Sequence, residues 1–240
     1  KYWQVLECAF YAAFYRVATL GSGAGVAAIY YFNERGVPYS KGTGLYTIEY
    51  MLHKVSIALF AGIFFILNWG YMQKYYSQYD MTLLIGFGVT FVIAAVLLLF
   101  ACSKKFHEVL LWIVRKLNRS GKLTEQVKKL EEQCAILEDA AATLLKRGGL
   151  IAGCILKNLL KFTFWYGIPF LILAETGKLT LSQGLAVTSL AMMLAAVIPA
   201  PAGIGSSEFV LTMLLAKIVG TGAAGSVALL YRFATFVLPF

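Results

Sequence analysis

Residues that hold metal ions or form disulfides are scarce in this chain of 240 residues. Only two histidines are present, His53 and His107, which excludes a multi-histidine metal site. The four cysteines show no CxxC or other metal-ligand spacing, so we expect neither a metal centre nor a disulfide framework. The only aspartates are Asp80 and Asp139, which argues against a transferase that binds diphosphates through metal ions. The sequence also has no nucleotide or redox motif, and we expect no cofactor.

Charged residues of both signs are few. They make up 14% of the chain, whereas hydrophobic residues make up 60%, and the mean hydropathy is +0.73. Soluble domains have roughly a quarter charged residues, so the composition predicts an integral membrane protein. The net charge of +9 comes from 21 basic and 12 acidic residues. Because the basic residues flank apolar runs, we expect membrane phospholipids as partners, and no nucleic acid.

Several apolar stretches are long enough to cross a bilayer, which takes about 20 residues of helix. Four such stretches are Thr43–Trp69, Met81–Cys102, Leu150–Ala174 and Gly222–Phe240. Leu181–Ile198 is a slightly shorter fifth, and Val5–Leu20 is expected to be the end of another span. The chain starts with Lys1 and has no signal-peptide layout. We therefore expect a piece of a longer protein, in which residues 1–240 form one transmembrane domain.

The segment Ser103–Gly149 between two pairs of spans differs from its surroundings. It carries ten basic residues, whereas the loops Gly70–Asp80 and Glu175–Thr180 carry one lysine each, which predicts a cytoplasmic location. Apolar residues within it recur at spacings of four and three, as in an amphipathic helix. These residues are Leu123, Val127, Leu130, Cys134, Leu137, Ala141 and Leu144. We expect an amphipathic helical hairpin folded on itself or on the membrane face; a partner-binding coiled coil, which would make a homo-oligomer, is the alternative.

Two Gly- or Pro-rich segments interrupt the hydrophobic pattern near the ends of the chain. The first is Thr19–Gly25 and the second is Pro199–Glu208, and each precedes a short apolar run. Lipid cannot satisfy the backbone groups that such breaks expose, so they persist at membrane depth only within protein or at a polar cavity. Paired breaks predict two corresponding halves with re-entrant helices, as at a transporter's binding site. For the first segment, close packing of small residues or an ordinary loop is the alternative.

A helix that begins inside the membrane offers free N–H groups and the positive end of its dipole. Both favour an anion such as a phospholipid phosphate. The small and polar residues of the breaks are therefore candidate cavity residues. In the second break they are Pro199, Pro201, Gly203, Gly205, Ser206 and Ser207. In the first re-entrant segment they are Thr19, Gly21, Gly23 and Gly25.

Placing an ionisable side chain within the membrane costs free energy, so each such residue in an apolar run is a candidate functional group. Arg232 lies deep in the last run, and we expect it to line the cavity and to pair with Glu208 or a lipid phosphate. A purely structural ion pair is the alternative. Glu208 begins the short helix after the break, where a carboxylate also suits the helix N-terminus. Arg16 stands just ahead of the first break and is a candidate for the same cavity.

Two further groups of charged residues share helix faces. Lys157 and Lys161 are four residues apart, and they are candidates for an entry path that attracts phosphate. Snorkelling to the cytoplasmic headgroups is the alternative for Lys157. Glu49, His53 and Lys54 also recur on one face. We expect them at the cytoplasmic interface, with a proton relay as the alternative.

Three stretches carry a resemblance to a known family. They are FYRVATLGSGAGVAAIYYFNERGVPYSKG from Phe14, PAPAGIGSSEF from Pro199, and LLYRFATFVLP from Leu229. The last two resemble the closing signature of the transmembrane region of lysylphosphatidylglycerol synthase/flippase proteins, which are bacterial and archaeal membrane proteins. The first is similar to the family's Gly-rich re-entrant segment. Firmicute-like members often read T-P-x-x-x-G-G-Q-P there, whereas this chain has Leu20 in place of the proline and Val26-Ala27-Ala28 in place of Gln-Pro, which weakens the carry-over of ligand contacts.

The resemblance implies a flippase-like domain with two re-entrant halves around a central headgroup cavity, in which Arg232 matches the arginine of the closing motif. In the best-known members this domain accompanies a cytoplasmic aminoacyl-transferase domain, which is either fused to it or a separate partner and makes lysyl-phosphatidylglycerol. The resemblance thereby also implies a role in resistance to antimicrobial peptides. No such domain lies in these residues, so we do not expect an enzyme. Standalone members generally have unassigned substrates.

The resulting prediction is an all-α polytopic helical bundle in the plasma membrane. Its expected function is translocation of an anionic phospholipid, or an aminoacylated one such as lysyl-phosphatidylglycerol, between leaflets. The first alternative is a membrane enzyme for lipid or polyprenyl-phosphate substrates, for which Glu49, His53 and Glu208 are the only plausible acid/base set. The second is a scaffold that recruits a partner through the segment 103–149.

Overall fold

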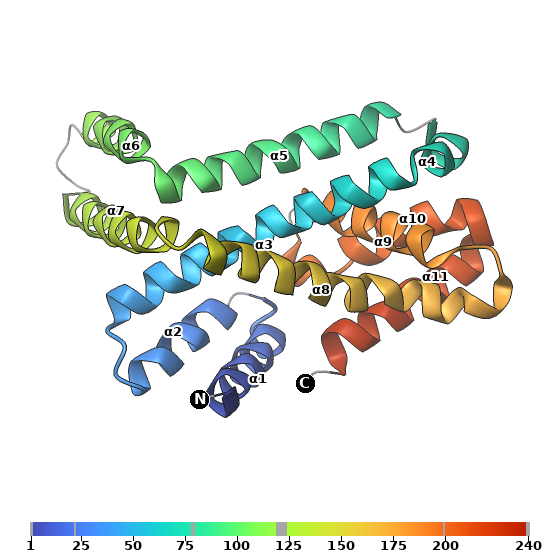
Figure 1. The fold of residues 1–240 in the computed structure, drawn as a ribbon, viewed down its shortest axis with the longest axis horizontal. Coiled ribbons are helices and arrows are strands. Elements are labelled where there is room, and N and C mark those ends of the chain that lie inside the picture. Colours follow the sequence, from blue (N-terminus) through green and yellow to red (C-terminus); the bar gives the residue numbers. More distant parts are fainter. Residues whose placement is uncertain (1, 22, 78–79, 119–123, 199, 239–240) are drawn as a thin grey trace.

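The computed structural model describes residues 2–21, 23–77, 80–118, 124–198 and 200–238. Within these ranges the chain forms eleven α-helices and no strands, which confirms the all-α class (Figure 1). The first six helices are α1 (Tyr2–Ala18), α2 (Ala24–Glu34), α3 (Tyr39–Leu67), α4 (Trp69–Tyr76), α5 (Asp80–Cys102) and α6 (Lys104–Leu117). The other five are α7 (Thr124–Leu145), α8 (Gly148–Leu173), α9 (Leu181–Ala195), α10 (Ser206–Val219) and α11 (Thr221–Arg232). Short turns follow α8 (Ala174–Thr176) and precede α10 (Pro201–Gly203), and a π-helical turn (Phe233–Val237) continues α11.

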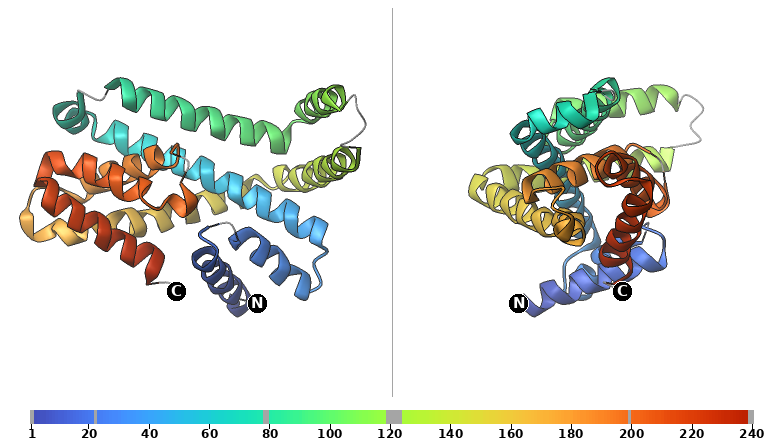
Figure 2. Two further views of the ribbon diagram at one scale, coloured as in Figure 1. Left: turned by 180° about the vertical axis from the view of Figure 1, so that it is seen from behind. Right: turned by 90° about the vertical axis from the view of Figure 1, so that its right-hand side faces the viewer.

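The long helix α3 runs diagonally through the molecule and contacts α2, α5, α7, α8 and α9 (Figure 1). In the described part of the chain, α3 alone is long and apolar enough to cross a membrane by length and composition, and α9 is a shorter apolar helix. The other long apolar stretches predicted from the sequence fall on α5, α8, and α11 with its π-helical turn. Both views in Figure 2 place α5 on the opposite side of α3 from α1 and α2.

The core lies where α9, α10 and α11 pack together with α3 and α8. Helix α9 is mostly apolar and is buried along most of its length, including Leu190 and Met193. It begins with a reciprocal cap in which Gln183 N donates to Thr180 Oγ1 and Thr180 N donates to Gln183 Oε1. From α10 the core includes the fully buried Leu211 and Leu214. This packing fixes the two ends of the second break.

Helices α6 and α7 pack against each other, and α7 also contacts α3 and α5. Of the predicted heptad positions, Val127, Cys134 and Leu137 are buried. Leu123 and the side chains of Ala141 and Leu144 lie outside the described residues. Across the pair of helices, Arg115 bonds Glu131 at 2.6 Å, and His107 Nδ1 lies 3.0 Å from Glu138 Oε1. The seam is thus covered by this chain's own helices, which favours a hairpin folded on itself over a coiled coil with a partner.

Candidate functional site

The first break is a tight reversal between α1 and α2. Gly21 N donates to Arg16 O at 2.7 Å and Leu20 N donates to Val17 O at 3.2 Å. These bonds form a Schellman motif, which places Leu20 in the left-handed region at φ 51°, a position that usually takes glycine. Thr19 Oγ1 accepts from Gly23 N at 2.6 Å and so satisfies a backbone donor at the start of α2. The break is therefore an ordered turn that ends α1 beside Arg16.

The three glycines of this segment serve different purposes. Gly21 has a φ of 98°, which an L side chain rarely adopts. A Cβ on Gly25 would lie 2.6 Å from the Tyr46 ring, and one on Gly23 would lie 2.6 Å from Thr19 Oγ1. Close packing of α2 against α3 and a broken helix are thus both present, although the sequence posed them as alternatives.

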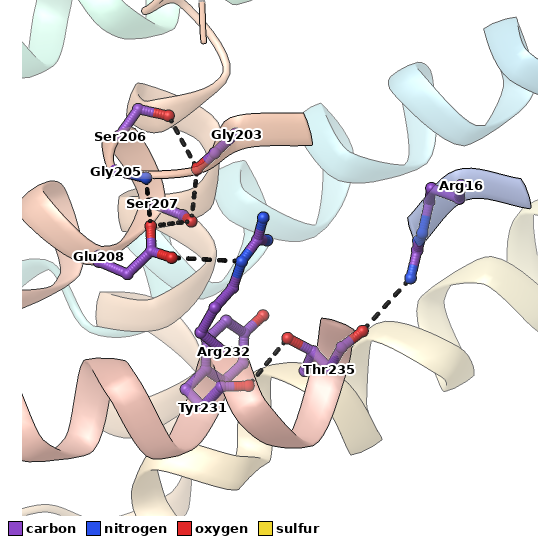
Figure 3. A network of polar contacts seen from close by, with 9 residues as sticks. All are labelled: Arg16, Gly203, Gly205, Ser206, Ser207, Glu208, Tyr231, Arg232 and Thr235. Carbon is purple, nitrogen blue, oxygen red and sulfur yellow. Dashed lines mark hydrogen bonds and ion pairs between the residues drawn. The ribbon is translucent and has the colours of Figure 1, made fainter. Parts of the chain in front are cut away.

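The second break connects α9 to α10 through a single turn of 3₁₀-helix that includes Pro201. Pro199 lies outside the described residues. Gly203 and Gly205 have φ values of 68° and 83°, so both require the freedom of glycine. The carbonyl oxygen of Gly203 lies 3.2 Å from the Ser206 hydroxyl and 2.8 Å from the Ser207 hydroxyl (Figure 3). The two serine side chains thus fold back onto the loop that precedes their own helix.

Glu208 joins this loop to α11. Its Oε2 accepts from Gly205 N at 2.8 Å and lies 2.9 Å from the Ser207 hydroxyl, which caps α10. Its Oε1 lies 3.2 Å from Arg232 Nε, with the two side chains 22% and 18% exposed (Figure 3). The expected Glu208–Arg232 ion pair is present, and Glu208 is also a capping residue. One carboxylate therefore fixes both the helix start and the arginine.

Arg16 reaches the same region from the end of α1. Its Nη2 donates to Thr235 O at 3.3 Å, in the π-helical turn after Arg232 (Figure 3). Its guanidinium carbon lies 5.9 Å from the ring centroids of both Trp165 and Phe236. Its buried Nε has no hydrogen-bond partner among the described residues. A buried cationic donor without a partner is costly, and an approaching anion would supply that partner.

A cavity of about 600 Å³ lies between the two breaks. Both breaks contribute to its wall, together with α3, α8, α11 and the π-helical turn. The polar and charged residues of the wall include Arg16, Tyr50, His53, Lys54, Tyr166, Ser206, Ser207, Tyr231, Arg232 and Thr235. Three of these are cationic, and no acidic residue is among the lining residues that the structure describes. The wall therefore favours an anion.

The structure brings six of the fifteen predicted site residues to this cavity. Arg16, Gly21, Gly203, Ser206, Ser207 and Arg232 line it. Gly205 and Glu208 are not lining residues, but Glu208 bonds to Gly205 N and to the lining residue Arg232. Thr19, Gly23 and Gly25 make the close contacts of the first turn and of α2. Lys161 Nζ lies 3.1 Å from the lining residue His53. Lys157 is exposed and does not line the cavity, as snorkelling would predict.

Sequence reasoning expected His53 and Lys54 at the cytoplasmic interface and did not connect them with the cavity, whose wall both line. It missed the aromatic part of the wall altogether. Phe162, Trp165, Tyr166, Tyr231 and Phe236 form this part. Aromatic residues are 15% of the chain, and those that line a cavity share no local pattern that separates them from those in the core.

A comparison with models of known protein families identifies the family of this chain. The model of the lysylphosphatidylglycerol synthase TM region matches residues 1–240, the whole chain. The chain belongs to this family. No curated protein and no solved structure matches it significantly. Membership of the lysylphosphatidylglycerol synthase TM region family indicates a membrane protein with a lipid-related function. Only the TM region is found in these residues, and no catalytic domain is detected.

Proposed function

We propose that this chain is a multi-pass flippase-like domain that moves a phospholipid with a phosphoglycerol headgroup, such as phosphatidylglycerol or its lysyl ester, between leaflets by binding the headgroup phosphate. The observation that carries the proposal is the cavity between the two breaks, which Arg16, Lys54 and Arg232 line without an acidic residue among the described lining. A lipid phosphate between Arg16 and Arg232 would supply the partner for the unused Nε of Arg16. Movement of one broken-helix half against the other would then expose the headgroup to alternate leaflets.

The proposed orientation follows from the basic residues. In it, the breaks are re-entrant segments that meet near the middle of the membrane, and α6 and α7 lie in the cytoplasm. In Figure 1 the connection between α2 and α3, helix α6 and the start of α7 are at one end of the molecule, whereas α4 and the connection between α8 and α9 are at the other. In the proposed orientation the cavity lies between these two ends, near the middle of the membrane, where a headgroup would be bound during transport.

A smaller recess of about 220 Å³ adjoins the cavity and suits a lipid better than a soluble anion. Tyr50, Lys54, Ile57 and Ala196 line both spaces. The remaining lining residues are the mostly apolar Thr90, Ile93, Met193 and Val197, from α5 and from α9 and the residues that follow it. An acyl chain in the recess would leave its phosphate near the cations of the cavity. The recess thus supports a substrate with one charged end and one apolar end.

Filling this recess should impair transport of long-chain lipid. Ile93→Trp is expected to slow transport of dioleoyl-phosphatidylglycerol about tenfold, because the indole would take the space that an acyl chain needs. Each methylene group of the chain that is no longer buried there loses about 0.8 kcal/mol. Binding of the water-soluble headgroup glycerophosphoglycerol should stay unchanged. Val92→Trp is the matched control, since Val92 is adjacent on α5, is 60% exposed and does not line the recess. Equal slowing by both variants would contradict an acyl-chain site at the recess.

The experiment that tests the function is lipid translocation in proteoliposomes. Fluorescent phosphatidylglycerol, lysyl-phosphatidylglycerol and phosphatidylcholine would each be followed by chemical quenching of the outer leaflet. We expect the two glycerol-headgroup lipids to cross faster than in protein-free vesicles, and phosphatidylcholine to cross at the protein-free rate. Protein-free rates for all three lipids would refute the proposed substrates.

The geometry gives less support to a membrane enzyme. Of the only plausible acid/base set, His53 lines the cavity, whereas Glu49 does not, and Glu208 is held by Gly205 N and Arg232. General acid/base catalysis needs such groups within hydrogen-bonding reach of one substrate. The cations of the wall suit retention of a phosphate better than its chemical conversion.

A further inference from the structure

Two basic side chains share a hydrogen bond at the wall of the cavity. Lys161 Nζ, from α8, lies 3.1 Å from His53 Nδ1, from α3, and 3.0 Å from Asn158 Oδ1. An ammonium group has donors only, so with Lys161 protonated His53 Nδ1 accepts, and the ring is then neutral with its proton on Nε2. The lysine and the histidine therefore hold one positive charge between them, although each could carry one.

The surroundings oppose a second proton while the cavity holds no anion. The charged groups that act on this pair are Glu49 and Lys54 on α3 and Arg16 on α1. Glu49 acts on Lys161, whereas Lys54 and Arg16 add positive charge near His53. The His53 ring also lies 5.2 Å from the Phe162 ring, an apolar neighbour. An imidazolium here would be repelled by three nearby cations, Lys161, Lys54 and Arg16, in a poorly hydrated setting, which is unfavourable.

The pair is placed to respond to an anion. His53 lines the cavity, as do the rings of Phe162 and Trp165, which lie 5.0 and 5.7 Å from Lys161 Nζ. Lys161 itself is half-buried behind these residues. A phosphate in the cavity would attract the ammonium away from His53 Nδ1 and would offset the positive charge of Arg16 and Lys54. Both effects favour protonation of the imidazole.

We propose that His53 is a proton-binding site whose occupancy is coupled to the anionic headgroup, so that the cavity carries a proton together with the lipid. The inference rests on the proposed headgroup site. As the phosphate enters, Lys161 releases Nδ1, whose lone pair forms an N–H bond with a proton taken from solvent. As the phosphate leaves, the proton returns to solvent and Lys161 donates to Nδ1 again. Because the bound state holds more protons, affinity for the headgroup rises as pH falls.

Proton uptake can be counted directly by calorimetry. Dihexanoyl-phosphatidylglycerol is a suitable probe, because its phosphodiester has no proton that titrates near neutral pH. Its binding to the purified protein would be measured in two buffers of equal pH and different ionisation enthalpy. The wild type should take up a fraction of a proton, at most one, for each lipid bound. Across the pH range in which His53 titrates, the affinity of the wild-type protein for the lipid should rise by up to about tenfold for each unit that pH falls.

The variant His53→Gln keeps a carbonyl oxygen for Lys161 and removes the proton site. It should bind the probe with no proton uptake and with a flat pH dependence. Lys41→Gln is the control, because Lys41 is an exposed residue of the same helix that does not line the cavity, and it should match the wild type. Binding by the wild type without uptake, or equal uptake in His53→Gln, would overturn the proton site alone. Absence of binding by the wild type would overturn the headgroup site and this inference with it.

Discussion

Arg232→Gln should weaken phosphatidylglycerol binding about 10- to 100-fold, because a charge-assisted bond to phosphate contributes about 1.5–3 kcal/mol. Glu208→Gln should bind the lipid at least as tightly as the wild type. The glutamine carbonyl can still accept from Gly205 N, and Arg232 no longer shares its charge with a carboxylate. The two halves of one ion pair are thus expected to respond in opposite directions. Binding can be measured by calorimetry with dihexanoyl-phosphatidylglycerol.

This asymmetry separates a binding role for Arg232 from a structural one. If the pair only holds α10 against α11, loss of either partner should lower the unfolding temperature and reduce binding to a similar extent. Such a result would contradict the proposed role. Arg115→Gln is the matched control, since Arg115 pairs with Glu131 between α6 and α7, away from the cavity. It should leave lipid binding unchanged.

Arg16→Met should stabilise the protein without lipid and abolish stabilisation by lipid. The Arg16 side chain has a buried Nε without a described partner and lies among Trp165 and Phe236. An arginine in a membrane helix costs about 3 kcal/mol on insertion scales, so a methionine of similar length should raise the unfolding temperature. It cannot bind phosphate, so added phosphatidylglycerol should no longer raise that temperature.

Thermal unfolding in detergent, with and without dihexanoyl-phosphatidylglycerol, measures both effects. Lys161→Met is an informative comparison, because Lys161 already has two partners, His53 Nδ1 and Asn158 Oδ1. Its loss should not stabilise the lipid-free protein. An Arg16→Met protein that is less stable than the wild type, or that is still stabilised by lipid, would show that Arg16 has a structural role.

The sequence predicted the breaks well, because Gly and Pro act locally. Gly21, Gly203 and Gly205 adopt positive φ at these breaks, and Glu208 caps the helix that follows the second one. The depth of Arg232 in an apolar run likewise indicated a buried partner, and Glu208 is that partner. The signals for the breaks and for the cap lie within about one turn of the residues concerned.

The rest of the site depends on contacts between distant segments, which no local pattern records. Arg16 bonds to Thr235, which lies near the other end of the sequence, and His53 on α3 contacts Lys161 on α8. The sequence showed that His53 and Lys54 share a helix face, but it could not show that this face turns toward the two breaks. Leu20 in a left-handed position was equally unpredictable, because glycine is the usual residue there.

The most direct test of the account is a cryo-EM structure of the protein in nanodiscs that contain phosphatidylglycerol, with an antibody fragment added for size. The account predicts density for one lipid whose phosphate lies between the guanidinium groups of Arg16 and Arg232, with an acyl chain in the recess beside Ile93. A cavity that contains no lipid phosphate, in a map that shows both arginine side chains clearly, would contradict it.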